Sequence, residues 1–146
     1  MGEDLYATDF YTWTQEQAAH LRSGRLSCTD IGNIAEEIET LGRSEASALR
    51  SAYRLIAMHL LKTMLQPDKA TPSPAVTIGR ERLDIEQILD ENPGLNSRRS
   101  ELFAKACGAA RREAALDTGL DRFPVLPPFT VDEVEADGTL PDRTGA

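Results

Sequence analysis

The residues best suited to chemistry form an acidic group in the middle of a predicted helix. Glu36, Glu37 and Glu39 are close neighbours, and Arg43 follows Glu39 at the spacing of one helical turn. Carboxylates in such a group can recognise a partner, bind a metal ion or transfer protons. On a solvated helix face they would instead pair locally with arginine. We interpret these four residues as a candidate interaction surface, with the locally paired face as the alternative.

A second candidate is a polar site around a histidine. His59 continues the predicted inward face one turn after Ile56, and Lys62 follows on the same stretch. Imidazole titrates near neutral pH, so His59 with an acid such as Glu113 would suit general acid–base chemistry. The simpler alternative for His59 is a core histidine that is hydrogen-bonded to a neighbouring helix.

The histidine content disfavours the metal centres that are typical of helical bundles. A di-iron site needs a Glu-x-x-His pair on each of two helices. Neither of the two histidines, His20 and His59, has a glutamate three residues before it. Glu16 and His20 share a helix face, but Zn²⁺ would need further ligands from other helices. We therefore expect no metal and no cofactor.

The charge balance weakens the hypothesis of nucleic-acid binding. The chain has 24 acidic residues against 16 lysines and arginines, which gives a net charge of −8. A basic cluster between residues 78 and 113 is balanced by as many acids, and no helix-turn-helix spacing or stacking aromatics accompany it. Weak nucleic-acid binding is therefore a second alternative only. The cluster consists of Arg80, Arg82, Arg98, Arg99, Lys105, Arg111 and Arg112.

Length and composition are typical of one globular domain, which we expect to lie in the cytoplasm. The chain has 146 residues, of which 40% are hydrophobic and 27% charged. No apolar run approaches the ~20 residues of a membrane span, and the N-terminus lacks the pattern of a signal peptide. Cys28 and Cys107 show no ligand or redox spacing, so we expect reduced thiols.

The hydrophobic periodicity predicts the helices that position these residues. An apolar series with steps of three and four residues runs without proline from residue 31 to residue 66, which indicates one long second helix. Shorter periodic segments predict helices over residues 9–22, 73–91 and 97–117. Gly42 lies beside a gap in the long series and marks where that helix would bend or break.

The C-terminal part is not periodic. Residues 123–129 are apolar but contain three prolines, which predicts an extended strap across the helices. Thr130 can cap one short turn that ends near Glu135, and residues 136–146 are expected to form a mobile acidic tail.

Together the elements predict an all-α fold, an antiparallel four-helix bundle with one long second helix and a Pro-rich C-terminal strap. We expect a single domain over residues 1–135. Its expected core consists of Trp13, Ile34, Ile38, Leu41, Ile56, Leu60, Ile85, Leu89, Leu102 and Phe103.

Two stretches of the chain are similar to a known family. Residues 9–17 read Asp-Phe-Tyr-x-Trp-Thr-x-Glu-Gln, and residues 33–45 read Asn-Ile-Ala-Glu-Glu-Ile-Glu-x-Leu-Gly-Arg-Ser-Glu. With His-Leu-Leu-Lys at residues 59–62 and Phe-Thr at residues 129–130, the chain resembles the bacterial family called domain of unknown function 29. The resemblance covers roughly residues 4–135 and implies an all-helical bundle in a soluble bacterial protein.

These observations favour a non-enzymatic function. We expect a small bundle that acts through protein contacts, as a homo-oligomer or as the regulatory partner of another protein, and that does not contact membranes. The alternative is a small metal- or acid–base-dependent enzyme with a site among His59, Glu113 and the acidic group.

Overall fold

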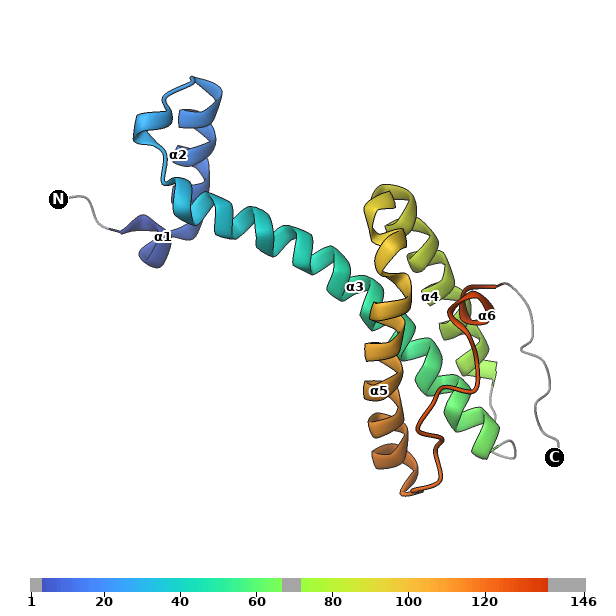
Figure 1. Ribbon diagram of the computed structural model, residues 1–146. Helices are drawn as coiled ribbons and strands as arrows, with labels where there is room; N and C mark the ends of the chain where they lie inside the picture. The colour runs from blue at the N-terminus through green and yellow to red at the C-terminus, as the bar shows by residue number, and fades with distance from the viewer. Residues whose placement is uncertain (1–3, 67–71, 137–146) are drawn as a thin grey trace. The chain divides into compact units, whose positions relative to one another are not determined.

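The computed structural model describes residues 4–66 and 72–136, and every regular element within them is helical (Figure 1). The all-helical fold class is confirmed, whereas the antiparallel four-helix bundle stays a prediction. The expected tail lies almost entirely outside the described residues. The elements are α1 (Leu5–Thr8), α2 (Phe10–Arg22), η1 (Leu26–Cys28), α3 (Ile31–Leu65), α4 (Pro72–Glu91), η3 (Pro93–Arg98), α5 (Arg99–Thr118) and α6 (Val131–Glu135).

Several helix ends lie where the capping residues predict them. The Asp9 carboxylate accepts a hydrogen bond from the Thr12 amide at 3.1 Å, so it satisfies a free donor at the start of α2. Gly24 follows α2 with φ of 73°, and Gly119 ends α5 with φ of 69°. Both glycines adopt the left-handed conformation that other residues avoid.

Helix α3 is one helix of 35 residues, so the break considered at Gly42 does not occur. A Cβ atom added at Gly42 would meet no heavy atom within 4 Å. Neither a turn nor a close contact therefore requires glycine at this position, and helix continues through it.

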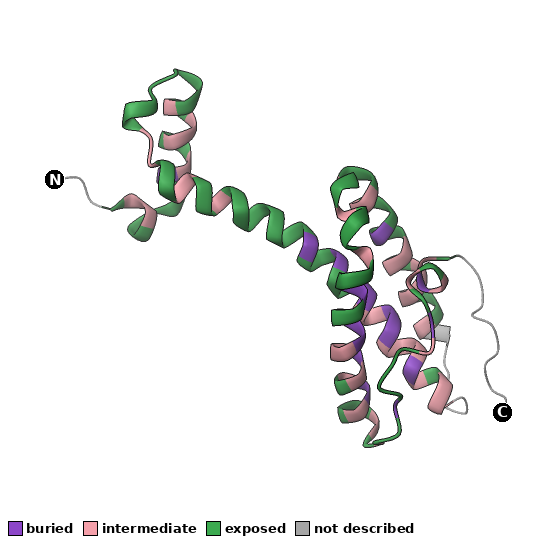
Figure 2. Ribbon diagram, in the orientation of Figure 1, coloured by how far each residue is buried: buried purple, intermediate pink, exposed green. Residues whose placement is uncertain are grey.

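The chain divides within α3 into two compact units, with the boundary between Arg43 and Ser44. The first unit contains α1, α2, η1 and the first part of α3, and the second contains the remaining elements. The burial of the residues of α3 changes near the same boundary, as Figure 2 shows. Before residue 46 the helix has no buried residue, whereas seven residues from Ala46 to Leu61 are buried.

Polar contacts around Asp30 hold the first unit together. Trp13 Nε1 donates to the Asp30 carboxylate at 3.1 Å, and Asn33 Nδ2 donates to the same oxygen at 2.8 Å. The Asp30 amide in turn donates to Gln17 Oε1 at 2.7 Å. These bonds fix α2 against the start of α3, where Trp13 is only 5% exposed.

Both N-terminal helices of this unit are hydrogen-bonded to α3 or to the residue before it. Trp13 contacts Asp30 at the start of α3, and Tyr6 OH donates to Glu37 Oε1 two turns further along at 2.6 Å. The Tyr6 ring lies edge-on to Trp13, with the ring centroids 4.8 Å apart. Tyr6, which comes before Trp13 in the chain, therefore contacts α3 further from its start than Trp13 does.

Two residues expected in the core are exposed. Ile38 is 62% and Leu41 is 68% exposed, so their assignment to the core was wrong. The short N-terminal helices reach the face of α3 that carries Asp30 and Glu37, and they leave the neighbouring apolar face uncovered. Ile34, at the edge of the covered face, is half-buried.

The second unit contains a hydrophobic core from α3, α4, α5, the strap and α6. Leu49, Tyr53 and Ile56 of α3 are fully buried, as is Val134 of α6. Phe123 and Phe129 are each 5% exposed, so the strap is anchored at both of its ends. The core assignments of Ile56, Ile85, Leu102 and Phe103 are confirmed, whereas Leu60 and Leu89 are half-buried and pack against the core.

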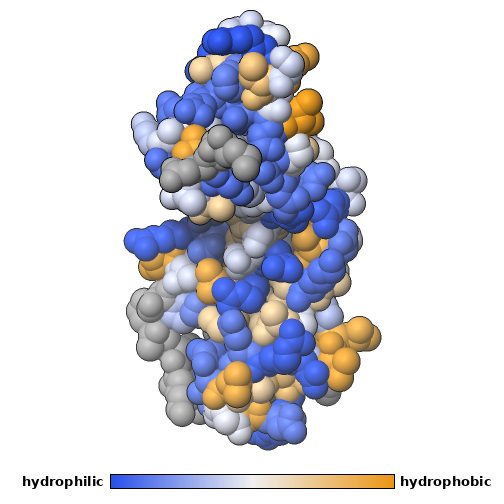
Figure 3. Space-filling view, turned by 90° about the vertical axis from the view of Figure 1, so that its left-hand side faces the viewer, coloured by the Kyte–Doolittle hydropathy of each residue, from blue (hydrophilic) through white to orange (hydrophobic). Residues whose placement is uncertain are grey.

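The face of the protein drawn in Figure 3 is largely hydrophilic. On the face drawn in Figure 3, hydrophobic side chains form separate patches among hydrophilic ones. Within residues 4–66 and 72–136, no helix combines the length and apolar character needed to cross a membrane. The exposed large apolar residues include Ile31, Ile38, Leu41, Leu83 and Leu116.

We expect the substitution Asp30→Asn to destabilise the first unit at pH 7 but not in strong acid. Hydrogen bonds from Asn33, and next from Trp13, lower the pKa of Asp30 below its ordinary value of 3.8. A lowered folded-state pKa gives stability that is present above pH 3.8 and is lost as the pH falls through the lower value. Fluorescence of Trp13, the single tryptophan, reports unfolding of this unit. A stability difference between variant and wild type that stays constant as the pH falls from neutral into strong acid would contradict this assignment.

Candidate functional site

Three of the four residues in the candidate interaction surface pair with one another. Arg43 lies 3.3 Å from a Glu36 oxygen and 3.7 Å from a Glu39 oxygen. It also donates to Thr40 Oγ1 at 2.9 Å. The charged side chains are about 60% exposed, and such surface pairs contribute between about 0 and 1 kcal/mol each. This face of α3 is a local ion-pair network.

Glu37 has a separate role in the same stretch. Its carboxylate accepts the hydrogen bond from Tyr6 OH, and this bond raises the pKa of Tyr6 to about 12. Tyr6 therefore remains a hydrogen-bond donor throughout the physiological range. Glu37 fixes α1 on α3, whereas Glu36 and Glu39 pair with Arg43.

The residues of the candidate polar site bond to different partners. Arg54 Nη1 donates to both oxygens of Glu113, at 2.5 and 2.6 Å. Lys62 Nζ lies 3.3 Å from Asp117. His59 is half-buried, and burial, followed by the nearby Lys62 charge, lowers its pKa. Among the described residues, the acid proposed for His59 is thus engaged by Arg54.

A polar network that the sequence did not reveal lies at the contact of α3, α5 and α6. Tyr53 OH donates to the Glu135 carboxylate in a short hydrogen bond. Arg99 Nε donates to Glu135 at 3.0 Å, and Arg99 Nη2 donates to Asp132 at 2.9 Å. Burial, and then the bond to Glu135, raises the pKa of Tyr53, while the Glu135 bond raises the pKa of Arg99.

Other contacts hold the same short helix. Thr130 and Glu133 form a capping box at the start of α6, which satisfies two backbone donors. The side chain of Arg82 on α4 donates to the Val134 carbonyl oxygen at 2.9 Å. Helix α6 is thus tied to α3, α4 and α5 by side-chain hydrogen bonds.

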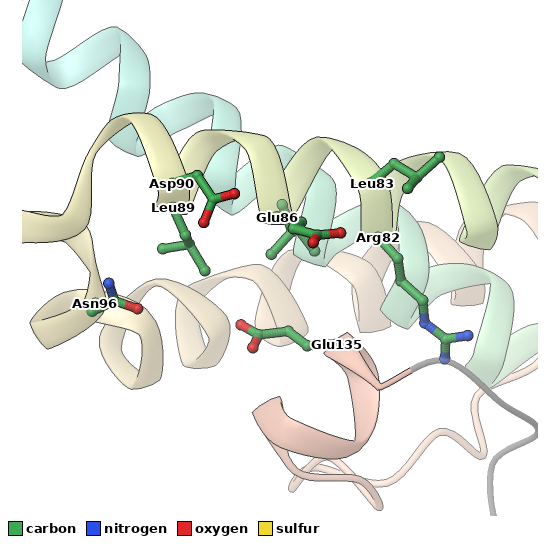
Figure 4. Close-up of a pocket in the computed structure, with 8 residues that line it drawn as sticks. Arg82, Leu83, Glu86, Leu89, Asp90, Asn96 and Glu135 are labelled. Atoms are coloured by element: carbon green, nitrogen blue, oxygen red, sulfur yellow. The ribbon is translucent and has the colours of Figure 1, made fainter.

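A cavity of about 370 Å³ lies beside this network (Figure 4). Arg82, Glu86 and Asp90 line it from α4, Asn96 lines it from η3, and Glu135 reaches it from α6. Because Tyr53 and Arg99 already bind the Glu135 carboxylate, this acid is fixed and suits a structural role better than proton transfer. In the two described ranges, no three side chains of the metal-binding types converge.

A family model described as domain of unknown function DUF29 matches residues 5–138. The chain belongs to the DUF29 family. The resemblance seen in the sequence is confirmed. Neither a curated protein nor a solved structure shows a significant match. The matched region of this DUF29 domain contains both the acidic surface of α3 and the network around Glu135.

The cysteines of this DUF29 domain do not suggest a nucleophile. Cys107 is buried in the core, and burial raises the pKa of its thiol to about 11. It therefore remains protonated at neutral pH, and a thiol is a poor nucleophile compared with a thiolate. Cys28 is exposed at the end of η1.

We expect Glu135→Ala to destabilise the second unit of the DUF29 domain by about 1–3 kcal/mol, because Tyr53 and Arg99 would lose their partly buried acceptor. Asp132→Ala is the matched control on the same helix. The Asp132 side chain is 83% exposed, so its pair with Arg99 contributes less than about 1 kcal/mol. Urea unfolding measures both variants, and equal losses would contradict the structural role of Glu135.

Proposed function

We propose that this DUF29 protein is a non-enzymatic protein-interaction module that self-associates through the first part of α3. The observation that supports this is an uncovered apolar stripe on that helix. Ile31, Ile38 and Leu41 are 62–68% exposed, and Ile34 lies between them. An exposed row of large aliphatic side chains is costly in water unless a partner covers it.

The spacing of the stripe favours another helix as the partner. Its residues follow one another at intervals of three, four and three positions, which is the a and d pattern of a coiled coil. Side chains at this spacing form a narrow seam that fits between the side chains of a facing helix. A second copy of the chain supplies a seam of the same shape.

The charges around the stripe would not oppose such a contact. By helical spacing, Glu36 and Arg43 lie on the side of α3 opposite the stripe, and Glu39 is also turned away from it. These residues pair with one another, and Glu37 at the flank is bound by Tyr6. The candidate interaction surface then forms the outer polar face and rim of the contact, while the apolar stripe forms its centre.

The four-helix bundle that the sequence predicts is formed by helices of one chain, whereas self-association would bring together four helices from two chains. Within the first unit, α2 is hydrogen-bonded to the start of α3. Two such pairs that meet at their stripes would make a bundle of four helices with an apolar interior. We further propose the bacterial cytoplasm as its location, where a free cysteine such as the exposed Cys28 stays reduced.

The enzyme alternative has weaker support. An acid–base site at His59 needs a carboxylate partner, and Glu113 is bound at both oxygens by Arg54. The cavity beside Glu135 likewise contains an acid whose hydrogen bonds fasten α6.

Sedimentation velocity over a range of protein concentrations tests the proposed self-association. The wild type should shift from monomer to dimer as concentration rises. The double variant Ile38→Lys, Leu41→Lys should stay monomeric with unchanged helical circular dichroism, because both side chains are exposed and lysine is a good helix former.

The control is the double variant Glu36→Gln, Glu39→Gln on the polar face. It should retain folding and most of the self-association. A wild type that remains monomeric at all concentrations would contradict the proposal, as would equal weakening by the two double variants.

A further inference from the structure

A groove of about 570 Å³ runs between α3 and α5 in the second unit. Its charged lining residues are all basic, although the whole chain carries a net charge of −8. Arg50 and Arg54 contribute from α3, and Lys105 and Arg112 contribute from α5. The remaining lining residues are small, namely Ser51, Ala104, Ala106, Gly108 and Ala109.

The four basic side chains differ in how they are held. Glu113 binds Arg54 through both carboxylate oxygens, and Glu101 lies 3.0 Å from Lys105. These acids do not line the groove. Neither Arg50 nor Arg112 has an ion-pair partner among residues 4–66 and 72–136. The groove thus combines two fixed cations with two cations that remain available.

Gly108 lies on the groove side of α5 without a packing reason to be glycine. A Cβ atom added there would meet only Arg112 Nη1, at the ordinary contact distance of 3.9 Å. Glycine destabilises a helix interior relative to alanine, so its presence here costs stability. The absence of a side chain at Gly108 leaves space beside the guanidinium group of Arg112.

We propose that this groove binds a small molecule that carries an oligophosphate group. Three of the four cations are arginines, whose planar guanidinium groups match the spacing of phosphate oxygens. An oligophosphate presents several negative charges in a row and can bridge α3 and α5. The volume of the groove lies within the range of about 300–1,000 Å³ found for small-molecule sites.

The net charge favours a small anion over a nucleic acid. A long polyanion would extend beyond the groove and meet the acidic surface of the chain. A small anion interacts mainly with charges within about 8 Å at physiological ionic strength. There Glu113 and Glu101 balance Arg54 and Lys105, and Arg50 and Arg112 supply the remaining positive charge. This ligand site is independent of the proposed self-association, because all its lining residues belong to the second unit.

Isothermal titration of the full chain with sodium tripolyphosphate, at physiological salt, tests the site. Arg50→Gln and Arg112→Gln should each weaken binding by about tenfold, since each removes a charge-assisted contact. Arg80→Gln on α4 is the matched control, because it makes the same charge change at an exposed position outside the groove and should leave binding unchanged. In NMR spectra, the ligand should shift the backbone amides of Gly108 and Arg112.

A parallel titration with ATP separates the possible sources of the phosphate. Equal affinities for the two ligands indicate recognition of the oligophosphate alone. Tighter binding of ATP indicates that the alanines lining the groove also contact the nucleoside. The proposal is overturned if neither ligand binds at about 1 mM, or if Arg80→Gln weakens binding as much as the groove variants. Tighter binding of a short oligonucleotide than of tripolyphosphate, lost in the groove variants, would also overturn it in favour of nucleic-acid recognition.

Discussion

The structure depends on how unequally the long helix α3 is covered. From Ala46 onward, α4, α5 and the strap bury one face of the helix and form the main core. Before that point the short N-terminal helices hold α3 mainly by hydrogen bonds to Asp30 and Glu37. The apolar stripe beside those contacts is left exposed. The apolar residues of α3 continue beyond the elements that cover this helix, so its first part has an apolar surface available for a partner. We therefore place the proposed self-association there.

The second unit shows how a small core can be combined with a polar surface. Phe123 and Phe129 anchor the strap, and the buried hydroxyl of Tyr53 reaches Glu135 on α6. The bond from Tyr53 fixes Glu135, which is one of five polar residues that line the 370 Å³ cavity. On another side of the unit, the small residues of α5 leave the basic groove open. The network around Glu135 and the basic groove both involve α5, which carries Arg99 near its start and Gly108 in its middle.

The sequence predicted the elements well because helices are specified by local patterns. Asp9 caps the start of α2, and Gly24 and Gly119 follow the ends of α2 and α5, by hydrogen bonding or backbone conformation that involves only near neighbours. Burial was harder to predict, since periodicity shows that Ile38 and Leu41 share a face but not whether anything covers it. The pairs Arg54–Glu113 and Tyr53–Glu135 join residues 59 and 82 positions apart. No short-range pattern signals such contacts, so the partner of Glu113 and the network around Glu135 could not be found from the sequence.

The central claim is that the first part of α3 gains its cover only when the protein associates. Hydrogen–deuterium exchange of the backbone amides, measured at low and high protein concentration, tests this claim most directly. The account predicts that residues 49–61 are strongly protected at both concentrations, because they form the core of the second unit. Residues 34–43 should exchange faster at low concentration and become protected as concentration rises. Protection of residues 34–43 that equals that of residues 49–61 at low concentration, and does not change with concentration, would contradict it.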